Sequence, residues 1–178
     1  MAKTYTTVPN VNTGDVYTAA NYNAYTATNI SNLIVPPMCQ MVITPSLSIA
    51  TTATDQTVTS ASFAIDTDTM SGIPNRITIA TAGVYLVSFS LQYAGNATGY
   101  RAATVAVSGT GSATASTGQG YTVLFGSASA ATTLVNTKLV SLATNDYLTL
   151  VTAQSSGGSL LLSSVNQYLQ ALWIGRTS

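Results

Sequence analysis

Few residues in this sequence can do chemistry, and the acidic pair Asp66 and Asp68 is the first candidate. Two carboxylates one residue apart, with Asp55 upstream, can present oxygen ligands to a hard cation such as calcium. The alternative is a turn in which each Asp accepts backbone N–H bonds and pairs with Arg76 or Arg101. We favour the turn over the metal site, and we expect no cofactor.

Two further side chains are candidates by their type. Arg101, which follows the turn residues 97–100, suits a ligand carboxylate or phosphate. We favour a structural role for it, in an ion pair that fixes a loop or joins two subunits. Cys39 lies in an apolar stretch, and no His is present to activate it as a nucleophile. We therefore expect a buried free thiol.

The composition excludes several classes of protein. Lys and Arg number 5, Asp and Glu number 5, and charged residues make up 6% of the chain, against about 25% in ordinary soluble domains. Without His, the usual general base and the commonest metal ligand are missing. Five scattered cations cannot neutralise a run of phosphates. We expect neither an enzyme nor a nucleic-acid partner, and a net charge of zero does not oppose self-association.

The 178 residues suffice for one domain with a short appendage. No apolar run reaches the roughly 18 residues that a membrane span requires. Residues 1–14 lack the apolar stretch of a signal peptide. We therefore expect synthesis in a cytosol and no membrane partner.

Residues 1–35 differ from the rest of the chain. Residues 3–14 include Pro9, show no periodicity and indicate an extended arm. From Thr18, the predicted N-cap, the spacing of apolar and aromatic side chains predicts one short helix, which Pro36 and Pro37 end. Helix propensity is poor here, so this helix must pack on something. The residues on its apolar side are Tyr22, Tyr25, Thr26, Ile30 and Leu33.

After Pro37 the apolar period changes to two, which predicts strands separated by turns. Eight or nine short strands without a second helix predict an antiparallel two-sheet sandwich. The low-complexity segment 109–120 predicts a mobile loop. The expected strands are residues 38–43, 57–65, 76–80, 84–93, 100–107, 121–126, 133–142, 147–153 and 167–174.

The last of these strands is apolar on both faces. A strand of this kind is buried on both faces, so one face serves the core and the other needs a partner. We predict core or trimer contacts for four of its residues, namely Tyr168, Leu172, Trp173 and Ile174.

Several segments also resemble a known family. They are FAIDTDTM (63–70), PNRITI (74–79), TAGVYLV (81–87), ATGYR (97–101), the leader TAANYN (18–23) and the final strand with Trp173. Together they resemble the jelly roll of complement and tumour-necrosis-factor (TNF)-like proteins, in the version found in tailed-phage structural proteins. The resemblance covers most of residues 18–175. It implies a ten-strand, two-sheet jelly roll that assembles as a homotrimer around a threefold axis.

The resemblance also implies a non-enzymatic structural protein of a phage virion. Residues 1–35 would anchor it to the particle, and residues 36–178 would display the jelly roll. We favour a capsid decoration or head-fibre protein that contacts the major capsid protein; the alternative is a tail or neck module that binds a carbohydrate or other receptor on the host surface. Either would be made in the host cytoplasm and assembled on the particle. The predicted anchor residues are Tyr22, Tyr25, Ile30 and Leu33.

Overall fold

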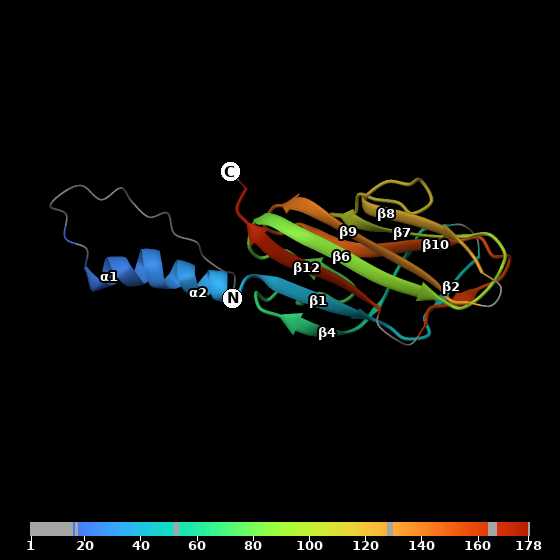
Figure 1. The fold of residues 1–178 in the computed structure, drawn as a ribbon, viewed down its shortest axis with the longest axis horizontal. Helices are drawn as coiled ribbons and strands as arrows, with labels where there is room; N and C mark the ends of the chain where they lie inside the picture. The colour runs from blue at the N-terminus through green and yellow to red at the C-terminus, as the bar shows by residue number, and fades with distance from the viewer. Residues whose placement is uncertain (1–15, 17, 52–53, 128–129, 164–166, 178) are drawn as a thin grey trace.

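The structure is a computed structural model that describes residues 16, 18–51, 54–127, 130–163 and 167–177. A β-sandwich forms the body, and a helix projects from one end of it (Figure 1). The predicted extended arm and the end of the chain at residue 178 lie outside the described residues.

The first sheet contains five antiparallel strands in the order β4-β1-β12-β6-β9. The first and last long strands, β1 and β12, are neighbours in it, with Gln40 opposite Gln170. The bounds are β4 (Ser60–Asp66), β1 (Met38–Ile43), β12 (Tyr168–Gly175), β6 (Gly83–Tyr93) and β9 (Thr132–Leu142).

The second sheet has the order β3-β10-β7-β8, and the short β5 also pairs with β10. A separate two-stranded pair closes one end of the body. The second-sheet strands are β3 (Gln56–Thr57), β10 (Tyr147–Gln154), β7 (Tyr100–Val107), β8 (Gln119–Phe125) and β5 (Ile77–Thr78). The separate pair is β2 (Ser48–Ile49) with β11 (Leu160–Leu161).

This architecture confirms the predicted all-β jelly-roll sandwich, and most predicted strands end within two residues of the observed ones. The stretch predicted as one strand over residues 57–65 divides into β3 and β4, which belong to different sheets. The pair β2 and β11 was not expected. Two residues are too few to show the alternation from which a strand is predicted.

The core lies between the two sheets and is explained by the alternation along β6. Tyr85, Phe89 and Tyr93 face inward and are fully buried together with the residues between them on the same face. Both tyrosine hydroxyls are satisfied, since Tyr85 donates to the Thr81 carbonyl at 2.5 Å and Tyr93 bonds the Thr152 hydroxyl at 2.5 Å. Buried polar groups of this kind need partners.

The Gly- and Ser-rich segment after β7 folds onto the outer face of the second sheet. Ser112 and Thr117 form a β-bridge, and Ala113 is buried against the small residues of that face. The Asp55 carboxylate accepts the backbone N–H groups of Ala113 and Thr114, each at 2.9 Å. The segment therefore packs on the sheet, where Asp55 supplies the acceptor that fixes the turn, and its mobility stays a prediction.

The predicted N-terminal helix is present, with Thr18 as its N-cap. The Thr18 hydroxyl accepts the backbone N–H of Asn21 at 3.2 Å, which satisfies one of the free donors of the first turn. The helix consists of α1 (Ala19–Asn21), a π-helical stretch η1 (Tyr22–Ala27) and α2 (Thr28–Ile34). Among the described residues, no helix is long and apolar enough to span a lipid bilayer.

Candidate functional site

The outward face of the first sheet presents a large surface without charge. Its side chains form three rows that cross the strands β1, β12, β6 and β9. An apolar row consists of Met38, Leu172, Leu86 and Leu139. A polar row consists of Gln40, Gln170, Ser88 and Thr137. A mixed row consists of Val42, Tyr168, Ser90 and Val135. We call these twelve residues the uncharged face.

The apolar part of the uncharged face is accessible in the single chain. Leu139 is 56% exposed and Val135 is 59% exposed, and Leu86 and Leu172 are half-buried. A shallow hollow lies on the same face among Gln40, Val42, Gln167 and Tyr168. An exposed apolar surface of this extent, built on rigid strands, is typical of a surface that binds another protein.

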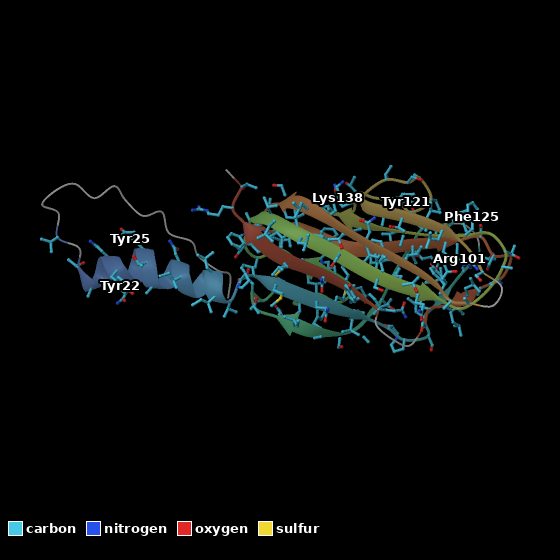
Figure 2. All side chains as sticks on the ribbon, viewed as in Figure 1. Tyr22, Tyr25, Arg101, Tyr121, Phe125 and Lys138 are labelled. Carbon is cyan, nitrogen blue, oxygen red and sulfur yellow. The ribbon has the colours of Figure 1, made fainter. Side chains whose placement is uncertain are left out.

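The charged residue nearest in sequence points the other way. Lys138 lies on β9 between Thr137 and Leu139, but it is opposite Val87, whose side chain faces inward. Figure 2 shows Lys138 near the edge that β9 shares with the second sheet. The uncharged face therefore stays uncharged up to its last strand.

The four predicted contact residues of β12 divide between the two faces. Tyr168 and Leu172 belong to the uncharged face, and Ile174 is 49% exposed near its end. Trp173 instead lies in the core, and its indole N–H donates to the Ala82 carbonyl at 3.3 Å.

Sequence reasoning did not find the part of this surface that lies on β6 and β9. Leu86, Leu139 and Val135 belong to strands that are far from β12 in the sequence. Alternation predicted the strand over residues 84–93, and the structure shows that its outer side is half polar, with Ser88 and Ser90 beside Leu86. What the sequence lacked was the strand order that places this side next to β12.

A second exposed apolar surface lies along the edge strand β8. Val123 and Leu124 are each 43% exposed. At the end of the same strand, Phe125 is 83% exposed and lies opposite the half-buried Tyr100. Figure 2 shows Phe125 at the end of the body that is remote from the helix.

The Asp66 carboxylate accepts hydrogen bonds from the turn that follows it, which is the alternative that we favoured over a metal site. Its carboxylate accepts the backbone N–H groups of Asp68, Met70 and Ser71 at 3.2, 2.9 and 3.0 Å, and the Ser71 hydroxyl at 2.5 Å. Burial raises the pKa of Asp66, but these hydrogen bonds outweigh it and hold the pKa below its ordinary value. Asp68 is fully buried. Among the described residues, no three His, Cys, Asp or Glu side chains gather as they would around a metal ion.

Arg101 fixes a loop, but without the expected ion pair. Its guanidinium donates to the carbonyls of Thr98 at 2.6 Å and Asn96 at 2.8 Å, and the side chain is fully buried at one end of the sandwich. Within the described part of the single chain, these two carbonyls take the place of the expected loop-fixing carboxylate, and an ion pair between subunits stays a prediction. Burial lowers the pKa of Arg101, and the nearby Tyr93 acts in the opposite direction. The carbonyls that accept its hydrogen bonds belong to the adjacent loop, which indicates a structural role.

Cys39 is a buried free thiol, as predicted. Burial raises its pKa to about 12, and the negative charge of Asp66 adds to the effect. A thiol with such a pKa is protonated and unreactive at neutral pH.

The predicted anchor residues are not covered by the sandwich. Tyr22 and Ile30 are about half exposed and Leu33 is 64% exposed, whereas Tyr25 is half-buried. Figure 2 shows Tyr22 and Tyr25 on the helix, clear of the body. Their role in attachment stays a prediction.

The fold of this chain is similar to the TNF-like and complement C1q jelly rolls of solved proteins. No family model matches the sequence, and no curated protein matches it.

Two solved proteins illustrate the likeness. Murine APRIL, crystallised at pH 5.0, superposes with a TM-score of 0.58 at 11% identity, over 78% of this chain and 98% of that chain. The globular domain of a zebrafish complement 1qA protein gives a TM-score of 0.55 at 16% identity, over 79% of this chain and 99% of that chain. At these identities the likeness establishes the fold alone.

Proposed function

We propose that this protein is a non-enzymatic structural protein of a tailed-phage particle. In this proposal it is a homotrimer whose jelly rolls are displayed outward and whose residues 1–35 attach it to the capsid as a decoration or head-fibre protein. The observation that carries the trimer is the uncharged face. Support for a phage particle comes from the sequence resemblance.

The uncharged face favours association because its desolvation costs little. Its apolar row gains the hydrophobic free energy of burial, roughly 25 cal/mol per Å² of apolar surface. Its polar row is already partly satisfied internally, since the Gln40 side chain donates to the Gln170 side chain at 3.1 Å. Burying a polar group costs least when a hydrogen-bond partner goes with it.

A ring of three requires a second surface, because rotation by a third of a turn brings two different patches into contact. The exposed residues Val123 and Leu124 on the edge strand β8 suit that role. In this arrangement the uncharged face of one copy covers the β8 edge of the next copy, and the ring closes.

The attachment end and the display end lie at opposite ends of the molecule. The helix leaves one end of the sandwich, and Phe125 and Arg101 lie at the other (Figures 1 and 2). A protein attached through its N-terminal segment would therefore point the Phe125 end away from the particle. This geometry suits a display role.

The tail-associated receptor-binding module is the second candidate, and one observation favours it. Tyr100, Tyr121 and Phe125 share the outer face of the second sheet, and Phe125 is largely exposed. Aromatic rings of this kind stack on sugars and on apolar protein surfaces. The receptor-binding role predicts that Phe125→Ala abolishes adsorption to host cells, whereas the decoration role predicts unchanged adsorption.

The test of attachment uses phage particles that lack the protein. The intact chain should sediment with them, and a chain without residues 1–35 should not, although light scattering should show that it is still a trimer. If the shortened chain sediments as well as the intact one, the attachment surface lies in the jelly roll and the division at residue 35 is wrong.

A further inference from the structure

The projecting helix has an apolar side that the rest of the described chain does not cover. Tyr22, Ile30, Leu33 and Ile34 are all about half exposed or more, and Figure 1 shows the helix beyond the end of both sheets. No acidic or basic residue occurs in its first or last turns. A helix of this length with weak helix formers is marginal in water unless its apolar side packs on a partner.

The π-helical stretch aligns these side chains. Tyr22 and Ile30 are eight residues apart, but two turns of α-helix take up about 7.2 residues, so an ordinary helix would rotate them out of line. A π turn closes with an i→i+5 bond and takes up about one residue more. With η1 spanning Tyr22–Ala27, Tyr22 and Ile30 come to the same side, and Leu33 and Ile34 flank that line one turn later. We call these four residues the helix seam.

The segment that joins the helix to the sandwich is fixed at the end of the uncharged face. The Thr67 hydroxyl donates to the Pro36 carbonyl at 2.6 Å and accepts the Met38 backbone N–H at 2.8 Å. On the other side, the Trp173 backbone N–H donates to the Pro37 carbonyl at 2.9 Å. The chain then enters β1, whose first residue, Met38, belongs to the uncharged face. Whatever covers that face therefore also lies beside the base of the helix.

We infer that the helix seam of each copy packs on the seams of the other two copies, forming a parallel three-helix bundle that continues the trimer along its axis. This inference rests on the proposed trimer, since three-fold closure of the uncharged face is what brings the three helices together. It assigns Tyr22, Ile30 and Leu33 to contacts between copies. Attachment to the particle is then left to the rest of residues 1–35.

The absence of charge in the helix is consistent with a second copy as the occupant. Identical helices in parallel place each residue beside its own counterpart, so any charge on the seam would meet a like charge. Like charges in close contact are destabilising. A partner with a charged surface would find no opposite charge on this helix with which to form an ion pair.

Disulfide trapping in the full-length protein tests the inference. In Ile30→Cys the new thiol lies on the seam, and in the control Ala20→Cys the thiol lies in the first turn on the opposite side of the helix. A disulfide forms only when the two Cα atoms approach within about 7 Å. The native Cys39 is buried and will not interfere. We expect mild oxidation to convert Ile30→Cys to covalent dimers at least tenfold faster than Ala20→Cys.

A second pair of variants measures the consequence for the helix. Ile30→Asp with Leu33→Asp should open the bundle, so that chymotrypsin cleaves after Tyr22 and Tyr25 about tenfold faster, while Ala20→Asp should leave the cleavage rate unchanged. Light scattering on the same samples reports the sandwich trimer separately. If the protein is a trimer but the two cysteine variants oxidise equally and the aspartates do not speed cleavage, the inference is overturned and the proposed trimer stands. If the protein is a monomer, both are overturned.

Discussion

The side chains of Gln40 and Gln170 join the first and last long strands by a 3.1 Å hydrogen bond on the outward face of the sheet. The pair lies between an apolar row and a mixed row, and no charged residue interrupts the three rows. The polar centre of this face is thus partly satisfied before any partner binds. This relationship makes the uncharged face suited to burial in an assembly.

Placing a charge on the uncharged face should break the trimer. Leu139→Asp puts a carboxylate into the apolar row, where burial without a partner costs about 2–7 kcal/mol, which corresponds to at least a thirtyfold weaker association. Sedimentation across a range of concentrations measures the change. Ser159→Asp, in an exposed loop, is the matched control and should remain trimeric. A trimer of undiminished stability in Leu139→Asp would exclude this face from the interface.

Trp173 and Ile174 are adjacent but should respond in opposite ways to truncation. Trp173 is packed in the core against Gly83, so Trp173→Ala should lower the free energy of unfolding by about 3–5 kcal/mol. Ile174 is half exposed, so Ile174→Ala should change the unfolding of the single chain little and should weaken association instead. Urea unfolding and light scattering separate the two effects. Equal loss of folding stability in both variants would contradict the assignment.

Acid should destabilise the fold through Asp66. Its pKa in the folded chain lies below the ordinary value of 3.8 because hydrogen bonds from Ser71, Met70 and Asp68 outweigh burial. The stabilisation is therefore complete above pH 3.8 and is lost as the pH falls through the folded pKa. Asp66→Asn should reduce stability at pH 7 and flatten the decline below about pH 4. Ser71→Ala, which removes one donor, should have a smaller effect in urea titrations, and an unchanged acid slope in Asp66→Asn would contradict the assignment.

Cys39 should resist alkylation in the native protein. Burial, helped by the charge of Asp66, raises the pKa of its thiol to about 12, so the contribution to stability is complete below pH 9.0 and declines as the pH rises towards 12. Iodoacetamide at pH 8 should label Cys39 about a hundredfold more slowly than a thiol introduced by Ser159→Cys. Urea should abolish the difference. If iodoacetamide labels Cys39 and the introduced thiol at equal rates in the native protein, β1 opens readily and the prediction is wrong.

The sequence predicted the elements whose periodicity is long and regular. The strand over residues 84–93 and the N-cap Thr18 were predicted because alternation and capping are local patterns. The uncharged face could be predicted only in part, since its β12 residues showed in the sequence but Leu139 depends on which strands pair. The π stretch at Tyr22–Ala27 has no local signal in the sequence.

The partners of the charged residues were also beyond the sequence. Arg101 was expected to form an ion pair. Within the chain, its guanidinium donates instead to the backbone carbonyls of Asn96 and Thr98, which the loop places beside it. Asp55 was considered only alongside Asp66, although it accepts backbone N–H groups from a turn 58 residues further on. Such partners come together only through tertiary contacts, which the spacing of residues along the sequence does not predict.

The mass of the purified full-length protein in solution tests the central claim most directly. Light scattering coupled to size-exclusion chromatography, at micromolar concentration and physiological salt, should give three times the chain mass of 18.3 kDa. The value should not change with added salt, because the uncharged face carries no charge for salt to screen. A stable species at the mass of a single chain would contradict the account.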